Sequence, residues 1–110
     1  MKTEQIDKFK QEIEEEIERR NYNSLVYVLF DELNTAPFAI HIFYRDHLFM
    51  VNSRDDRSYV LGKTFEFTNF SEAKDKFFKL LDFIVREGRR DVAKRGSYMY
   101  SSPLWDDAAE

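Results

Sequence analysis

Paired carboxylates and two histidines are the residues of this sequence whose chemistry could support catalysis. A small metal-dependent nuclease or hydrolase needs oxygen and nitrogen ligands around a metal ion, and the chain offers Asp31, Glu32, Asp55 and His41. Their spacing matches neither a zinc site nor a calcium loop, which would place a glycine after Asp55–Asp56. His41 lies among apolar residues, which is typical of a packed, hydrogen-bonded histidine. A hydrolase therefore remains an alternative, and we predict no metal or other cofactor.

The composition excludes several other kinds of active site. The chain has 110 residues and no cysteine, so it holds no thiol nucleophile, disulfide or cysteine-ligated cluster. Its three scattered glycines do not make a phosphate-binding loop. The net charge of −4 disfavours nucleic acid as a partner, because phosphate binding requires a basic surface. No apolar run approaches the roughly 20 residues that span a bilayer, so we expect no membrane insertion and a cytoplasmic location.

Hydrophobic periodicity predicts the elements that would position these residues. Apolar residues at spacings of three and four indicate an N-terminal helix and a second long helix, with Thr3 and Asn69 as N-caps. Between them, β-branched and aromatic runs cut by turn residues indicate strands. The expected segments are a helix over 3–20, strands over 25–32, 38–44, 48–52, 59–61 and 64–67 with a bend at Gly62–Lys63, and a helix from Asn69 or Ser71 to Gly88 or Gly96.

This order of elements predicts an α+β fold in a single domain over residues 1–110. We expect an antiparallel four- to five-stranded meander sheet with the N-terminal and C-terminal helices packed on one face. Both alternating faces of the first three strands are apolar, so the face without helices needs another cover. Either the C-terminal tail or a binding partner is expected to supply it.

The C-terminal tail is rich in large apolar side chains. Tyr98, Tyr100, Leu104 and Trp105 surround a Ser-Ser-Pro turn, whereas disordered segments are poor in such residues. We therefore predict an ordered aromatic tail as far as Trp105 that folds back onto the domain. Residues 106–110 are expected to fray.

Recognition of another protein is the function that these features favour. Acidic loops suit a basic partner, and tyrosines are frequent interface anchors. The candidate partner-binding residues are Asp31, Glu32, Asp55, Asp56, Tyr98 and Tyr100. The basic residues within 86–95 suit the C-terminal end of a helix, where cations meet the negative end of the macrodipole, and the acidic run 12–18 suits a solvated helix face. Self-association through the second sheet face is a further alternative, so we expect a monomer or a weak homodimer.

Several stretches together resemble a known protein family. They are Val60–Lys63, then Phe65, Phe67 and Asn69–Phe70, then Ala73, Lys76 and Phe77 on a helix, and finally Tyr100 to Trp105. In this order they are similar to the bacterial immunity proteins of polymorphic toxin systems, in particular the immunity protein 59 family, over most of the chain. The resemblance implies a non-enzymatic cytoplasmic antitoxin that binds a cognate protein toxin and blocks it by direct occlusion. It supplies neither a set of binding residues nor the activity of the toxin.

Overall fold

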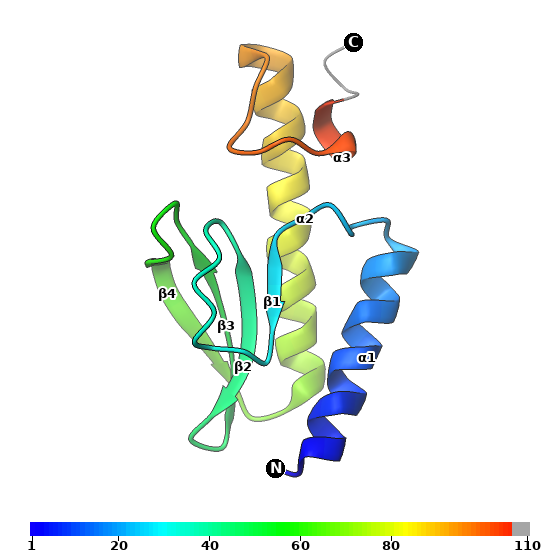
Figure 1. The fold of residues 1–110 in the computed structure, drawn as a ribbon, viewed down its shortest axis with the longest axis vertical. Helices are drawn as coiled ribbons and strands as arrows, with labels where there is room; N and C mark the ends of the chain where they lie inside the picture. Colours follow the sequence, from blue (N-terminus) through cyan, green and yellow to red (C-terminus); the bar gives the residue numbers. More distant parts are fainter. Residues whose placement is uncertain (107–110) are drawn as a thin grey trace.

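The computed structural model describes residues 1–106, which form three helices and four strands (Figure 1). In chain order these are α1 (Thr3–Arg19), β1 (Tyr27–Leu29), β2 (Ile40–Arg45), β3 (Leu48–Arg54), β4 (Val60–Phe67), α2 (Phe70–Arg95) and α3 (Pro103–Asp106). β1 is shorter than the predicted strand over 25–32. The two predicted pieces around Gly62 form one strand, β4, in which Gly62 has a φ of 70°. Glycine adopts this conformation without steric cost, which accounts for the predicted bend.

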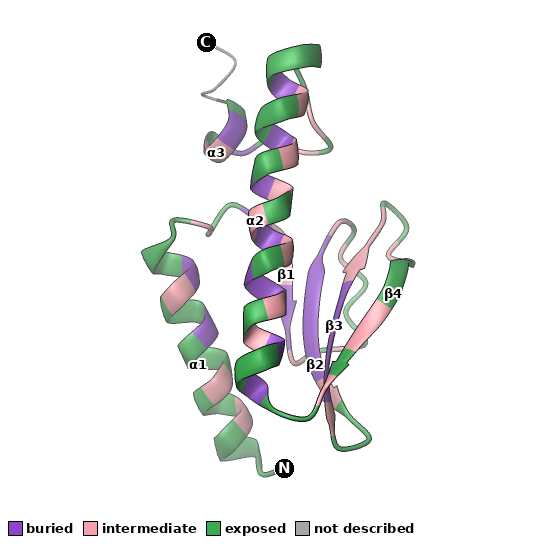
Figure 2. Cartoon of the chain, turned by 180° about the vertical axis from the view of Figure 1, so that it is seen from behind, coloured by how far each residue is buried: buried purple, intermediate pink, exposed green. Residues whose placement is uncertain are grey.

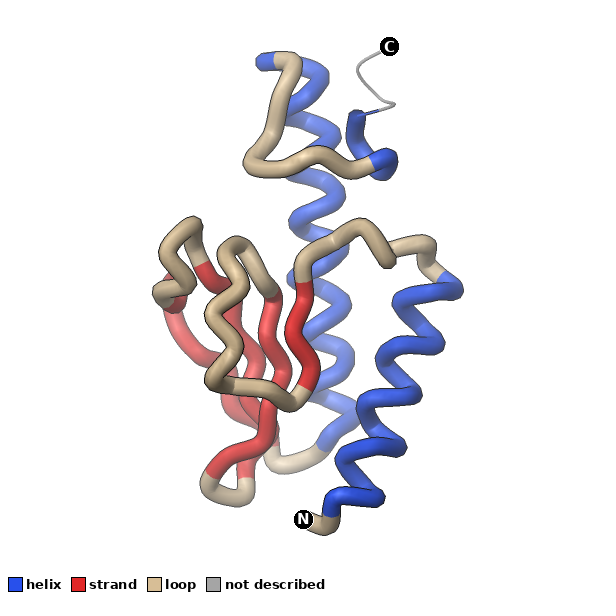
Figure 3. The backbone as a smooth tube through the Cα atoms, in the orientation of Figure 1, coloured by secondary structure: helices blue, strands red, loops and turns tan. Residues whose placement is uncertain are grey.

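The strands form one four-stranded mixed sheet in the order β1-β2-β3-β4 (Figure 3). β2, β3 and β4 are antiparallel neighbours, but β1 lies parallel to β2, with Tyr27 opposite Ile40 and Leu29 opposite Ile42. The predicted antiparallel meander is therefore wrong for β1. Two parallel neighbours require a connection that returns along the sheet, and residues 30–39 make that return. The turn residues around Pro37 are equally compatible with a simple reversal, so the sequence pattern does not reveal it.

We call residues 30–39 the crossover segment. It contains no helix or strand and is fixed to the sheet at both ends. The N–H of Phe30 donates to the carbonyl of Ile42 at 2.8 Å, and the N–H of Phe38 donates to the carbonyl of Asp55 at 3.0 Å. Phe30 and Phe38 have φ values of 54° and 65°, which are rare for bulky residues. The surrounding bonds thus hold both ends in conformations that an isolated chain would avoid.

The main core lies between the sheet and α2, whose buried residues face the strands (Figure 2). Ile42 and Val51 of the sheet and Phe77 and Leu81 of α2 are each 0% exposed. Alternation along β2 and β3 sends every second side chain to this face. The apolar stripe of α2 meets them because its members recur every three or four residues.

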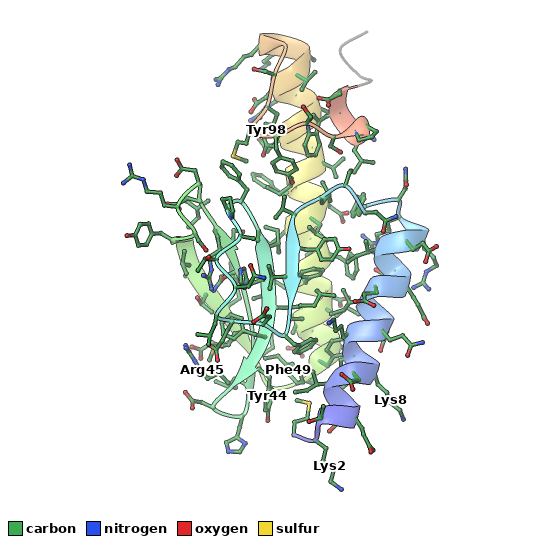
Figure 4. The ribbon with its side chains drawn as sticks, viewed as in Figure 1. Lys2, Lys8, Tyr44, Arg45, Phe49 and Tyr98 are labelled. Carbon is green, nitrogen blue, oxygen red and sulfur yellow. The ribbon has the colours of Figure 1, made fainter. Side chains whose placement is uncertain are left out.

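α1 packs at the side of the same core. The Phe9 ring stacks on Phe70 with centroids 4.0 Å apart and meets Phe49 edge-on at 5.6 Å; Figure 4 shows Phe49 at the lower end of the sheet. The ammonium of Lys74 on α2 lies 3.2 Å from the carboxylate of Glu16 on α1. Burial raises the pKa of Glu16, but the hydrogen bond and charge of Lys74 and the nearby arginines outweigh it, so the pKa is lowered on balance. Stacking and this half-buried ion pair together fix α1 against α2.

The helix ends follow the sequence signals in part. Asn69 caps α2 as predicted, since its side-chain oxygen accepts the N–H three residues on at 2.9 Å. Thr3 is instead the first residue of α1, and Lys2 precedes it without a side-chain capping bond. α2 continues through Gly88 to Arg95, and Gly96, which has a φ of 78°, is its C-cap. Among the described helices, none is both long and apolar enough to cross a membrane.

The C-terminal tail packs on the far end of α2, beyond the sheet (Figure 1). Trp105 is 0% exposed, and its indole N–H donates to the carbonyl of Tyr100 at 2.9 Å. Gly88 of α2 lies directly beneath the indole, because a Cβ built there would be 2.6 Å from two of the ring carbons. The tail therefore folds back as far as Trp105, but onto α2. Asp106 ends α3, and the rest of the segment predicted to fray, residues 107–110, lies outside the described residues.

Candidate functional site

The crossover segment covers the second face of the sheet. In Figure 1 it passes in front of the strands, whereas α2 lies behind them, and Figure 2 shows α2 from that other side. The side chains that alternate away from α2 are nonetheless buried; they are Val28, His41, Phe43, Met50 and Asn52. Sequence reasoning proposed the tail or a partner as the cover, and both proposals are wrong for this part of the sheet. The outer surface of the crossover segment is therefore what a partner can reach on this side.

One end of the crossover segment combines carboxylates with an exposed hydrophobic side chain. Asp31 is exposed, and Glu32 accepts a hydrogen bond from the guanidinium of Arg45 at 3.2 Å. That guanidinium also lies 5.7 Å from the ring centroid of Phe43, at the lower end of the sheet in Figure 4. Leu33 is 87% exposed. This end thus offers a partner both negative charge and apolar contact area.

The other end adjoins the turn between β3 and β4. The carboxylate of Asp55 accepts the backbone N–H groups of Arg57 at 2.8 Å and Tyr59 at 2.9 Å, so it shapes the turn. Asp56 is exposed, and so are the large side chains that follow, with Tyr59 68% and Leu61 54% exposed. Here too, an exposed carboxylate stands beside apolar surface.

The two candidate tyrosines, Tyr98 and Tyr100, pack around Trp105 in the C-terminal tail and lie near the Asp55 end of the crossover segment. Tyr98 and Tyr100 have ring centroids 5.2 and 5.1 Å from that of Trp105. Burial raises the pKa of Tyr98 to about 12. Tyr100 also lies 6.1 Å from the ring of Phe38, whose N–H is bonded to Asp55. The structure therefore brings the tyrosines toward the Asp55 end of the crossover segment, while the other pair of predicted carboxylates lies at the opposite end.

A polar network beneath the crossover segment supports the β3–β4 turn. Asn52 donates to the hydroxyl of Thr64 at 3.0 Å and accepts from the guanidinium of Arg54 at 2.9 Å. Arg54 also donates to the carbonyl of Ser58 at 3.3 Å. Because these bonds link β3, β4 and the turn, they fix the direction in which the turn presents its exposed residues.

The residues of the hydrolase alternative do not form a site. His41 is 0% exposed, and neither ring nitrogen has a hydrogen-bond partner among residues 1–106, so the predicted hydrogen bond is wrong. Burial, and then the charge of Arg54, lowers the pKa of His41 to about 4. Within the described part of the chain, no three histidine, aspartate or glutamate side chains gather to hold a metal ion. The carboxylates named for this role are divided between the two ends of the crossover segment.

Sequence reasoning missed the exposed hydrophobic side chains Leu33, Tyr59 and Leu61 as candidate contacts. A signal was present for two of them, because both follow a charged turn: Tyr59 directly precedes the last strand of the sheet order, and Leu61 belongs to it. A strand at a sheet edge has one unpaired side. Leu33 carries no such signal, since its exposure depends on the path of the crossover segment.

Comparison with known protein families finds a match over most of the chain. A family model described as immunity protein 59 matches residues 6–106, which include every strand and helix described above apart from the first turn of α1. No curated protein matches the chain, and no solved structure matches it. The match confirms the resemblance inferred from the motifs between Val60 and Trp105.

Proposed function

Since the chain belongs to the immunity protein 59 family, we propose that it binds a cognate bacterial toxin domain in the cytoplasm and blocks it by direct occlusion, without catalysing a reaction. The family match carries this proposal. An immunity family implies a toxin-inhibiting role in general, and the match extends over nearly the whole chain. The family match supports only this general role, and binding to one specific toxin is the part that we propose in addition.

We place the contact surface along the outer side of the crossover segment and the β3–β4 turn. Asp31, Glu32 and Asp56 supply charge there, and Leu33 and Tyr59 supply apolar area. In protein interfaces, buried hydrophobic anchors contribute most of the affinity and surrounding charges select the partner. A toxin surface that combines basic and apolar residues would complement this arrangement.

The remaining predicted residues take supporting positions in this proposal. Asp55 holds the turn through its carboxylate, so it sets the direction of Asp56. Tyr98 and Tyr100 are half-buried against Trp105, and their exposed edges extend the surface at the second end. A contact surface whose parts are already fixed loses little conformational entropy on binding.

The charge of the chain favours such an encounter. A net charge of −4 attracts a basic toxin over distances of about 10 Å at 0.1 M salt. This attraction raises the rate of association and rejects partners of the wrong sign. Association with the toxin is therefore expected to slow as salt concentration rises.

The proposal is tested with the product of a toxin gene that neighbours the gene for this chain. We expect co-expression to rescue growth and the two purified proteins to form a complex in size-exclusion chromatography. The double substitution Asp31→Lys and Asp56→Lys reverses the charge at both positions. It should lower the affinity of the complex by about tenfold or more, because two charge contacts become repulsive. No rescue and no complex with that neighbour would refute the proposed function.

A matched variant tests the place of the surface. Glu15→Lys together with Glu18→Lys makes the same change in net charge on the exposed side of α1. We expect it to slow association only slightly and to keep the affinity. If the α1 variant loses the complex while the Asp31–Asp56 variant keeps it, the acidic helix is the contact surface and our placement is wrong.

The weak homodimer remains a prediction, and it does not depend on the proposed toxin-contact surface. Light scattering over a range of protein concentrations measures it directly. A constant mass equal to that of one chain would exclude the weak homodimer.

A further inference from the structure

A cationic cleft lies on α2, on the side away from the crossover segment. It has a volume of about 600 Å³ and is lined by Tyr22, Lys79, Asp82, Val85, Arg86 and Arg89. Tyr22 comes from the connection between α1 and β1, and Arg89 reaches α3 by donating to the carbonyl of Leu104 at 2.8 Å. The lining residues therefore come from α2 and from the connection that follows α1, and Arg89 links the cleft to α3.

The only carboxylate among the lining residues is already neutralised. Asp82 accepts a hydrogen bond from the Tyr22 hydroxyl at 2.6 Å and two from the guanidinium of Arg20 at 3.1 and 3.3 Å. Burial and this hydrogen bond raise the pKa of Tyr22, so its hydroxyl stays protonated. Asp82 is thus committed to Arg20 and Tyr22, and the other charged groups of the cleft are all cations.

Those cations form no salt bridge within the part of the chain that the structure describes. Lys79, Arg86 and Arg89 make no ion pair with any carboxylate of residues 1–106, although other lysines and arginines of the chain do. Positions 79, 86 and 89 fall on one side of α2 because they are separated by seven and three residues. Like charges this close repel each other, so the arrangement costs stability unless something compensates for it.

The helix macrodipole does not explain these cations. Its effect on side chains is confined to the last turn of a helix, and α2 ends at Arg95. Lys94 and Arg95 lie in that turn, whereas Arg89 is more than one turn earlier and Lys79 lies in the middle of the helix. The interpretation of the whole basic cluster as a helix-end feature is therefore insufficient for the residues of the cleft.

We propose that this cleft receives a carboxylate-bearing acidic segment of the toxin, an inference that rests on the proposed function. Guanidinium groups bind carboxylates in a bidentate geometry. Arg86 and Arg89 supply two such groups, while Val85 and the Tyr22 ring supply an apolar wall. A volume of about 600 Å³ accommodates one or two side chains and not an extended surface.

Acidic protein is favoured over nucleic acid for a physical reason. Binding to a phosphate backbone depends on many contacts along a continuous basic surface, but this chain carries a net charge of −4. The acidic α1 ends shortly before Tyr22, which lines the cleft. A positive cleft and the negative crossover surface would together fix the orientation of a toxin whose charges are arranged in the opposite sense.

The cleft is tested on the isolated chain with an acetylated hexaglutamate peptide at low ionic strength. NMR titration should show saturable shifts of the amides of Lys79, Arg86 and Arg89. Lys79→Glu with Arg86→Glu should weaken peptide binding by about tenfold or more, because two attractive contacts become repulsive. The matched control, Lys94→Glu with Arg95→Glu, makes the same charge change on the same helix and should leave the affinity within about twofold. Thermal unfolding verifies that both variants are folded.

The other outcomes overturn the proposal. Absence of saturable shifts in the cleft, or equal losses in the two variants, shows that no carboxylate site exists there. Tighter binding of a single-stranded oligonucleotide than of the peptide assigns the cleft to nucleic acid instead. Binding measurements with the toxin distinguish the cleft proposal from the proposed function. Full affinity of the Lys79–Arg86 variant rejects the cleft alone, whereas peptide binding without any toxin complex rejects the proposed function alone.

Discussion

Replacing Gly88 by alanine provides the sharpest test of how the tail is held. The new Cβ would lie 2.6 Å from two carbons of the Trp105 indole, whereas carbon atoms normally pack about 3.5–4.0 Å apart. Alanine is favoured over glycine within a helix by about 1 kcal/mol. Overpacking costs about 1–3 kcal/mol, so we expect Gly88→Ala to destabilise the protein by ~1 kcal/mol on balance.

The sign should reverse when the indole is removed. In a Trp105→Ala background no ring meets the new methyl group, so Gly88→Ala should stabilise the protein by about 1 kcal/mol. The coupling between the two positions is then about 2 kcal/mol or more. Ala93→Gly supplies the matched control, because Ala93 is an exposed position of the same helix. It measures the alanine–glycine difference at a solvent-exposed position.

Urea unfolding followed by far-ultraviolet circular dichroism measures these free energies. Trp105 is the only tryptophan of the chain, so its fluorescence reports on the tail alone. The emission of Gly88→Ala should shift to the red before unfolding, because the tail gives way more readily than α2. Unchanged emission together with a stability gain of equal size in both backgrounds would refute the packing of Trp105 on Gly88.

Three further predictions concern the sheet and the helix cap. Burial holds the pKa of His41 at about 4, below its usual value, so the unfolded chain binds the proton first. The free energy of unfolding is therefore highest above about pH 6.5 and falls toward pH 4, and the loss between pH 7 and pH 5 is about 2 kcal/mol. Urea unfolding at pH 7 and pH 5 measures this loss, and the loss should be much smaller in His41→Gln. Asp46 and His47 have φ values of 54° and 65° in the β2–β3 hairpin, so replacing them with Asn and Gly should raise stability by about 0.5–1 kcal/mol in thermal unfolding. Asn69→Ala should cost about 1 kcal/mol and Asn69→Ser almost nothing, since only a side-chain oxygen is needed; equal losses would contradict the capping role.

Local signals in the sequence predicted most of the elements. The apolar spacing in α2 and the cap at Asn69 depend on neighbouring residues alone, so the sequence reveals them. The same holds for the break between the predicted strands 38–44 and 48–52, where the chain turns at Asp46–His47. The mixed sheet could not be predicted, because the choice between a reversal and a return after β1 depends on distant bonds such as Phe38 to Asp55.

The candidate surface was predicted only in part for the same reason. Charge and residue type identified Asp31 and Asp56, since both need only to be exposed. Their separation to the two ends of the crossover segment depends on its path across the sheet. The cleft on α2 depends on the position of Tyr22 beside a helix far along the chain. The contact of Trp105 with Gly88 likewise has no signal in the spacing of either residue.

The irregular cover on the second face of the sheet affects how the protein can evolve. A helix in that place would have to keep an apolar stripe aligned with the strands, so each exposed change would be limited by the buried positions beside it. The crossover segment needs little more than its anchors at Phe30 and Phe38. Between them, the exposed positions can change in sequence with little penalty for the core. A lineage can therefore change this exposed surface while it inherits the same scaffold.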